Sequence, residues 1–181
     1  MSQASTPPSD HLSESALLQG FPPVIDATTH TLILGSFPGE ASLRAQQYYA
    51  FKQNQFWRLL SGALNDNLVE LPYPQRLQGL LAHGIGLWDV FGACRRQGSL
   101  DAAIRQGAPN DFHALQRNYP RLKTLCFNGN MAGKMRAQLE QMSYRTLQLP
   151  SSSPAYAQMR FEEKLEHWKQ IVERNDAPRR R

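Results

Sequence analysis

Four short apolar runs recur along the sequence, and each one stops at a glycine or a polar loop. They are "TLILGS" (31–36), "GIGLWDV" (84–90), "TLCFNG" (124–129) and "RTLQLPS" (145–151). Runs of this length, bounded by turn residues, are typical of buried strands. Patterns of helical length lie between them, and strands that alternate with helices favour a parallel sheet covered on both faces. We therefore expect an α/β protein with a central four-stranded parallel sheet.

Six segments between and after these runs carry helical patterns. The last, residues 160–174, has one apolar stripe made of Phe161, Leu165, Trp168 and Val172. Such a stripe is typical of core packing, so Trp168 is given no functional role. The other five begin at Asn54, Pro72, Ser99, Asn110 and Asn130, several of which are residues suited to capping a helix.

The length of 181 residues suits one compact domain, which buries about two-thirds of the surface that its unfolded chain exposes. Residues 1–20 contain few large apolar groups, so we expect a flexible N-terminal segment there. A single domain over residues 21–175 and a basic tail over residues 176–181 complete the expected organisation.

The net charge of +5 is concentrated toward the C-terminus, where residues 121–181 hold 12 Lys and Arg against 6 Asp and Glu. Such a segment is attracted to polyanions through counterion release, but a solvated basic tail also serves solubility. Charge alone is thus a weak indication of nucleic-acid binding.

Cys94 and Cys126 are the only cysteines, too few for a disulfide framework or an iron–sulfur cluster, and no clustered Cys/His pattern indicates zinc. The chain has no signal-peptide pattern and no apolar run of about 20 residues, the length that crosses a bilayer. We expect a reduced, cytoplasmic monomer that contacts no membrane and needs no metal or organic cofactor.

The stretch "GSFPGEASLRAQQYYAFKQNQFW" (35–57) follows the first predicted strand and is rich in rings and side-chain amides. In "GSFPG", Gly35 and Gly39 bracket a tight turn whose backbone is able to approach a ligand. The motif alone matches neither a phosphate-binding loop nor a dinucleotide fingerprint, so an ordinary strand-to-helix turn is the better explanation of this motif by itself.

The loop "LPSSSPAYA" (149–157) follows the last predicted strand with three hydroxyls. Serine hydroxyls and backbone N–H groups bind phosphate oxygens, yet a Ser/Pro loop is also an ordinary turn. Parallel strands bring their carboxyl ends to one edge of a sheet, so residues 35–57, 88–90, 127–129 and 149–155 are expected to converge there.

Asp89 ends the second predicted strand, where α/β sheets place functional groups. It is suited either to a structural cap or to accepting a hydrogen bond from a ring N–H. A serine hydrolase ranks low, because neither "GSFPG" nor "PSSSPA" fits the G-x-S-x-G elbow. The five histidines are His11, His30, His83, His113 and His167. Three of them lie within helical patterns, where a surface or packing role is more usual than catalysis.

Taken together, five segments resemble the hypoxanthine-DNA glycosylases of the uracil-DNA glycosylase superfamily, over about residues 32–168. The segments are "GSFPGEASLRAQQYYAFKQNQFW", "GIGLWDVFGACRRQGSLDAAIR", "NDFHAL", "FNGNMA" and "LPSSSPAYA". The resemblance implies a three-layer α/β/α sandwich with a central four-stranded parallel sheet. It also implies that the first and last loops flank a flipped-out nucleotide.

The resemblance implies roles for individual residues. Asn54 in "NQFW" matches the amide that is important in the hypoxanthine enzymes, and Tyr49 resembles the aromatic residue that stacks on the extruded base. Phe37 stands where other superfamily members carry a water-positioning residue, and Leu149 stands where they carry the His or Asn that contacts uracil. We expect base binding by Gly35, Ser36, Phe37, Tyr49 and Asp89, and DNA contacts from Pro38, Gly39, Lys52, Ser151, Ser152, Ser153 and Pro154.

The predicted activity is hydrolysis of the N-glycosidic bond of deaminated bases in DNA, chiefly hypoxanthine, during base excision repair, with no Schiff-base lysine. Two alternatives stay open. One is a non-catalytic nucleic-acid-binding module of the same fold, which Phe37 supports, and the other is a uracil- or xanthine-directed glycosylase. The partner in each case is DNA, so the protein is expected to associate with the nucleoid.

Overall fold

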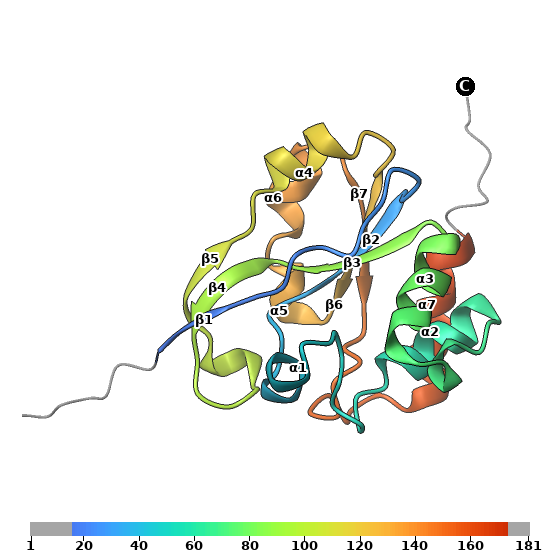
Figure 1. The fold of residues 1–181 in the computed structure, drawn as a ribbon, viewed down its shortest axis with the longest axis horizontal. Helices are drawn as coiled ribbons and strands as arrows, with labels where there is room; N and C mark the ends of the chain where they lie inside the picture. The colour runs from blue at the N-terminus through green and yellow to red at the C-terminus, as the bar shows by residue number, and fades with distance from the viewer. Residues whose placement is uncertain (1–15, 174–181) are drawn as a thin grey trace, which may run out of the picture.

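Four parallel strands form the centre of the molecule in the computed structural model, which describes residues 16–173 (Figure 1). The strands lie in the order β3-β2-β6-β7. Each coincides with a predicted apolar run, so all four strands and their parallel arrangement are confirmed. Their bounds are β2 (Thr31–Gly35), β3 (Ile85–Asp89), β6 (Thr124–Asn128) and β7 (Arg145–Leu149).

Helices cover both faces of this sheet, which confirms the three-layer sandwich (Figure 1). Along β2 the side chains alternate, so Ile33 packs in one layer while Leu32 and Leu34 pack in the other. One layer holds α2 (Phe56–Leu64), α3 (Tyr73–Ala82) and α7 (Phe161–Glu173). The other holds α4 (Phe112–Asn118), α5 (Asn130–Gly133) and α6 (Arg136–Gln141).

The helices predicted from Asn54, Pro72, Asn110 and residue 160 are confirmed, and the one predicted from Asn130 is divided into α5 and α6. The helix predicted from Ser99 is wrong. That segment forms only the 3₁₀ turn η2 (Asp101–Ala103) before strand β5 (Arg105–Pro109), because the chain there pairs with a neighbouring strand. The short helices α1 (Glu40–Ala45) and η1 (Leu68–Glu70) were not predicted.

A second, antiparallel sheet flanks the first and was not predicted. It contains β1 (Leu17–Gln19), β4 (Phe91–Arg95) and β5 in the order β1-β4-β5. Only Val90 separates β3 from β4, so one length of chain runs from the parallel sheet into the antiparallel one (Figure 1). Strand β1 thus lies before Phe21, where the sequence predicted a flexible segment, while residues 1–15 and 174–181, including the expected basic tail, lie outside the described residues.

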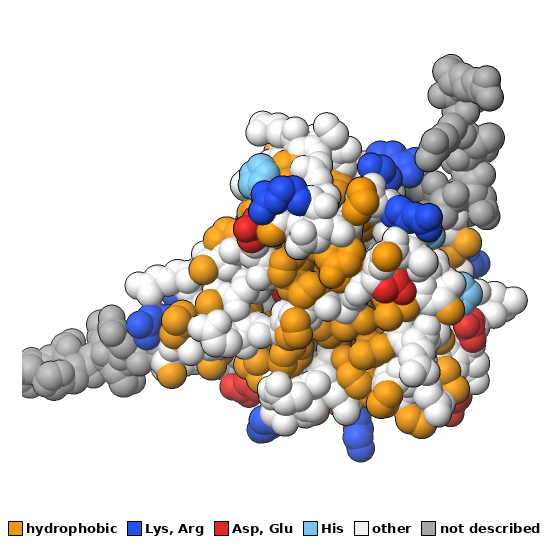
Figure 2. Space-filling model, turned by 45° about the horizontal axis from the view of Figure 1, so that its top comes forward, with side chains coloured by type: hydrophobic (Ala, Val, Ile, Leu, Met, Phe, Trp, Pro, Cys, Tyr) orange, Lys and Arg blue, Asp and Glu red, His pale blue; other side chains and the backbone are white. Residues whose placement is uncertain are grey.

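Figure 2 shows hydrophobic side chains gathered across the middle of one face, with most basic side chains nearer its margins. Within residues 16–173, no helix is long and apolar enough to cross a membrane.

Trp168 of α7 joins the helical layer to the chain that follows β7. Its side chain is fully buried, and its ring meets Phe56 edge-to-face with the centroids 5.5 Å apart. Its indole Nε1 donates a hydrogen bond of 3.1 Å to the carbonyl of Pro150. The apolar stripe on α7 thus serves the core, as its spacing predicted, and also holds one end of residues 150–157.

Replacing Trp168 by Ala is expected to destabilise the fold by about 3–5 kcal/mol, because a large buried ring leaves a cavity. Trp168→Phe keeps most of the ring contacts and loses the hydrogen bond to Pro150, so a smaller loss of about 1–3 kcal/mol is expected. Urea unfolding followed by circular dichroism measures both. If both variants lose the same free energy of unfolding, the hydrogen bond to Pro150 and not the packing of the ring accounts for the contribution of Trp168.

Candidate active site at the carboxyl ends of the parallel strands

The loops that follow the parallel strands enclose a cavity of about 570 Å³, here called the main cavity. This volume lies within the range of about 300–1,000 Å³ that is usual for small-molecule pockets. Almost every predicted site residue lines it: Gly35, Ser36, Phe37, Pro38, Gly39, Tyr49, Asn54, Asp89, Ser151, Ser152, Ser153 and Pro154. The exposed Lys52 lines instead a neighbouring cavity of about 320 Å³, the side cavity.

Asn54 lies in the wall between these two cavities and borders both. Its Oδ1 accepts a 3.0 Å hydrogen bond from the backbone N–H of Phe56 at the start of α2. Because a backbone N–H can only donate, this contact fixes the amide orientation. The Nδ2 group has no hydrogen-bond partner within the described part of the chain and is left as a donor for a ligand.

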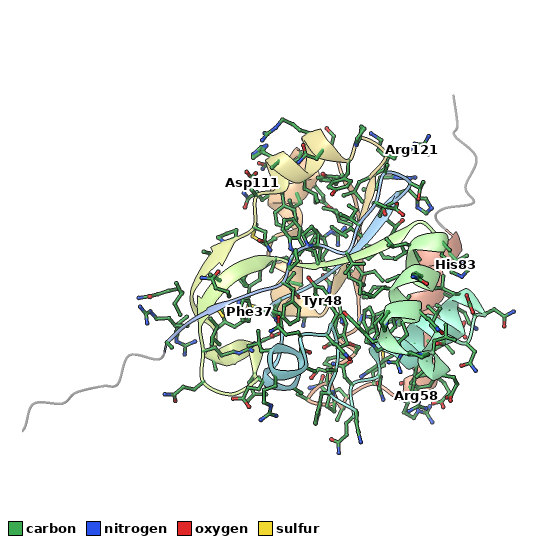
Figure 3. All side chains as sticks on the ribbon, viewed as in Figure 1. Phe37, Tyr48, Arg58, His83, Asp111 and Arg121 are labelled. Atoms are coloured by element: carbon green, nitrogen blue, oxygen red, sulfur yellow. The ribbon has the colours of Figure 1, made fainter. Side chains whose placement is uncertain are left out.

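Tyr49 presents its ring to the main cavity from a strained backbone position, with a φ of 55°. One face of the ring stacks on Phe56, with 3.6 Å between centroids and 4° between planes. The expected stacking on a base is therefore restricted to the opposite face. Phe56 and Trp57 are buried in the core, and Tyr48, which is labelled in Figure 3, belongs to the same buried cluster.

The first loop, residues 35–39, is held by two charged residues that the sequence analysis did not select. The Ser36 hydroxyl donates to a carboxylate oxygen of Asp101. Arg96 lies over the Phe37 ring, 5.2 Å from its centroid, and donates through Nη2 to the carbonyl of Pro38. The Ser36 hydroxyl is thus already bonded to Asp101, and the Phe37 ring is already in contact with Arg96. The predicted contacts of these two side chains with a base would have to compete with these interactions.

Asp89 lies at the end of β3 in the wall of the main cavity, and only 4% of its surface is exposed. Its Oδ2 is buried with no hydrogen-bond partner. Burial and, to a smaller extent, the negative charge of Asp101 raise the pKa of the carboxyl, Arg96 lowers it, and together they bring it to about 8. At neutral pH the group is therefore mostly a protonated acid, so the expected acceptor-only carboxylate is corrected to a donor and acceptor.

Gly35 is the residue whose missing side chain leaves room for both Asp89 and Tyr49 beside the first loop. A Cβ atom at this position would overlap Oδ1 of Asp89 and lie 3.0 Å from the Tyr49 hydroxyl. The glycine predicted for close approach of the backbone to a ligand thus first allows close approach of two cavity side chains.

Asn128, at the end of β6, is a cavity residue that sequence analysis missed. Its Nδ2 donates one hydrogen bond of 2.9 Å to Ser152 Oγ and another of 3.2 Å to the Tyr49 hydroxyl. Its Oδ1 accepts a hydrogen bond of 2.9 Å from the backbone N–H of Ser152. Ser152 is fully buried, and its carbonyl accepts from the N–H of Gln55. Ser152 therefore has a structural role in the free protein, and its predicted DNA contact stays a prediction.

The Ser151 hydroxyl accepts a hydrogen bond from the backbone N–H of Ser153, and the Ser153 hydroxyl accepts one from the backbone N–H of Ala155. These turns leave Pro154 exposed at the rim. Leu149 is buried in the core, so no polar group from that position reaches the cavity. None of the histidines within residues 16–173 lines the main cavity, so a serine hydrolase lacks its base there.

Comparison with known proteins adds independent information. A family model described as the uracil DNA glycosylase superfamily matches residues 22–174. A curated protein of Methanosarcina acetivorans, named hypoxanthine DNA glycosylase, is 47% identical over 137 residues, which cover 76% of this chain and 87% of that protein. A protein of Methanosarcina barkeri with the same name is 46% identical over 137 residues, with the same coverage.

A solved structure shares the fold. The solution NMR structure of a Methanosarcina acetivorans protein, provisionally assigned as a uracil DNA glycosylase, superposes with a TM-score of 0.80 and 40% sequence identity. The match covers 90% of this chain and all of that protein.

The raised pKa of Asp89 predicts how stability depends on pH. Because the folded state holds this proton up to about pH 8 and the unfolded state loses it near 3.8, stability falls as pH rises between these values. Asp89→Asn removes the effect, so it should raise Tm at pH 8 by at least ~2–4 °C and change it least at pH 4. Thermal melts across this range test the expectation, and an equal shift at every pH would contradict it.

Proposed function

The chain belongs to the uracil DNA glycosylase superfamily, and from that premise we propose that it releases hypoxanthine from deoxyinosine in DNA. Hydrolysis of the N-glycosidic bond adds water to C1′ of deoxyribose and leaves the free base and an abasic site. The observation that carries the proposal is the main cavity, whose lining brings together the amide of Asn54, the buried acid Asp89 and the aromatic ring of Tyr49. The reaction belongs to base excision repair, and the chain would act on DNA as a monomer in the cytoplasm, at the nucleoid.

The base has to leave the helix before it is cleaved, because its glycosidic bond is inaccessible inside a duplex. Extrusion costs a few kcal/mol and costs least at mismatched or damaged bases. Tyr49 lines the main cavity and is proposed to stack on the extruded base through the ring face opposite Phe56, and stacking of this kind contributes about 1–3 kcal/mol. The cavity volume supports entry of a purine together with part of its sugar.

Asp89 is proposed to bind the edge of the base. Hypoxanthine carries a ring N–H donor next to a carbonyl acceptor, and a protonated carboxyl offers an acceptor and a donor side by side. The unpartnered Oδ2 supports this assignment, because a buried polar atom without a partner is costly unless a ligand supplies one. Uracil and xanthine carry the same pair of groups, so a panel of single-lesion substrates is needed to rank the three bases.

Asn54 is proposed to act on the departing base. As the bond from C1′ breaks, negative charge develops on the base while the sugar becomes oxocarbenium-like. The Nδ2 group of Asn54 is a fixed donor at the cavity wall, and a donor aimed at developing charge lowers the barrier. A neutral amide suits this role because the substrate base enters uncharged.

The rim of the cavity is proposed to contact the DNA backbone. Lys52 is exposed beside the side cavity and is suited to a phosphate. Backbone groups of residues 35–39 and the turns around Ser151 and Ser153 complete this surface, with Pro38, Gly39 and Pro154 among them.

Asn54→Asp tests the donor role without removing the helix start, because a carboxylate oxygen still accepts the N–H of Phe56. We expect hypoxanthine release from a deoxyinosine duplex to fall about a hundred- to thousandfold, as for the loss of one transition-state donor. Alkali-induced strand cleavage after incubation measures the abasic product. The exposed neighbour provides the control Gln53→Ala, which should keep wild-type activity, and undiminished release by Asn54→Asp would remove the amide from the mechanism.

The acid form of Asp89 predicts an alkaline limb in the activity. Since the pKa is about 8, deprotonation above this pH removes the donor and places a charge in the cavity, so kcat/KM for deoxyinosine should fall. Asp89→Asn keeps a donor and an acceptor at every pH and should lose this limb. Measuring kcat/KM from pH 6 to pH 10 for the wild type and for Asp89→Asn tests this expectation. If kcat/KM of the variant falls at the same pH as that of the wild type, the fall is due to another titrating group.

A further inference from the structure

One lysine is buried behind the loops that line the main cavity. Lys164 of α7 is 1% exposed, although lysines are almost never fully buried unless they are paired. Within residues 16–173, no carboxylate forms an ion pair with it. Burial lowers the pKa of its ammonium, because the charged form is disfavoured away from water. Only hydrogen bonds compensate this charge, and an apolar side chain of similar length would avoid its cost, so the lysine indicates a task beyond packing.

The ammonium of Lys164 joins two segments that border the main cavity. Its Nζ donates a hydrogen bond of 3.0 Å to Oε1 of Gln55 and one of 2.9 Å to the carbonyl of Tyr156. The Tyr156 ring also lies near the charge, with 5.2 Å between Nζ and the ring centroid. Tyr156 lines the main cavity, and Gln55 directly follows Asn54, which lines it as well. An ammonium has three donors, so one side chain is able to bond both oxygens.

Gln55 links this contact to the amide of Asn54. The Gln55 backbone N–H donates a 3.0 Å hydrogen bond to the carbonyl of Ser152, while its side chain accepts from Lys164. Gln55 also stands between Asn54 and Phe56, and the N–H of Phe56 orients the Asn54 amide. A shift of Gln55 would therefore move both partners of the contact that sets the direction of Nδ2.

The loop over residues 150–157 is held near both of its ends by helix α7. Lys164 bonds the carbonyl of Tyr156, and Trp168 bonds the carbonyl of Pro150. Residues four apart lie on the same face of a helix, so a single face of α7 makes both contacts. Helix α7 also packs against α2, the helix that begins after Gln55 (Figure 1). Lys164 is thus the point at which α7, this loop and the chain before α2 are bonded together.

We propose that Lys164 is a positioning residue for cleavage, which fixes Asn54 in the wall of the main cavity relative to the loop over residues 150–157. It acts through Gln55 and does not touch the substrate. The inference rests on the proposed function, because it requires that Asn54 act on the departing base. A displacement of about 1 Å in a reacting group is able to lower a rate about a hundredfold, so a clamp at this place matters for the chemistry.

Lys164→Met tests the clamp, because it keeps an unbranched side chain and removes the ammonium. We expect kcat for hypoxanthine release from a deoxyinosine duplex to fall about 10- to 100-fold while KM changes less than about threefold, since the cavity keeps its lining. The matched control is Lys169→Met on the same helix. Lys169 pairs with Glu166 at the surface and lines neither cavity, so this variant should keep the wild-type kcat.

A double-mutant cycle tests whether Lys164 acts through Asn54. Asn54→Asp already removes the donor, so adding Lys164→Met should lower kcat little further, whereas two independent losses would multiply. Gln55→Met removes the amide oxygen and keeps the backbone N–H that bonds Ser152, so it should reproduce the loss seen in Lys164→Met and add nothing to it. Thermal melts show which variants are folded. If Lys164→Met does not fold, the cycle of Gln55→Met with Asn54→Asp decides.

Three results would overturn the proposal. Multiplied losses in the cycle would show that Lys164 supports the fold independently of Asn54. An unchanged kcat in Gln55→Met or in Lys164→Met would remove the clamp from the mechanism. If Lys164→Met instead keeps its kcat, binds duplexes more weakly and lowers the slope of log affinity against log salt by about 0.9, the charge serves a phosphate. A wild type that releases no hypoxanthine would refute the proposed function itself.

Discussion

The side-chain amide of Asn128 holds the loops of the cavity together. It bonds twice to Ser152 and once to the Tyr49 hydroxyl, and Ser152 in turn accepts the N–H of Gln55. Strand β6, the loop after β7 and the loop before α2 are therefore joined at one buried point. Such a network is rigid when fully bonded and costly when one member is lost, so the positions of Tyr49 and Asn54 depend on it.

A second constraint is electrostatic. Asp89, Arg96 and Asp101 come together around the first loop, although none of them forms an ion pair in the described part of the chain. Burial and the neighbouring carboxylate outweigh the arginine, so Asp89 keeps its proton. The Asp89 carboxyl thereby adds no negative charge to the cavity wall, which suits the proposed substrate, whose reacting group is neutral before the bond breaks.

Much of this architecture was predictable because it depends on local patterns. Apolar runs ended by a glycine or a polar loop identified the four parallel strands, and their parallel order placed Asp89 at the edge that lines the cavity. The second sheet was missed because "SLDAAIRQG" looks helical locally, whereas pairing with β4 makes its second half extended. Arg96 and Asp101 were missed for a similar reason, since their contacts with Pro38 and Ser36 span 58 and 65 residues of sequence. The three consecutive serines 151–153 look alike in the sequence, so the sequence does not predict that Ser152 is buried while Ser151 and Ser153 are partly accessible.

The direct passage from β3 into β4 has a practical meaning for anyone redesigning this protein. Asp89 and Leu100 are carried by one uninterrupted length of chain, with Val90 as the sole joint between the sheets. Replacing Asp89 alone would leave Arg96 and Asp101 in place, although their charges act on the pKa of the carboxyl that was removed. Grafting residues 85–109 as one cassette would transfer the carboxyl proposed to bind the base together with the charges of Arg96 and Asp101, which set its protonation, and the paired strands β4 and β5.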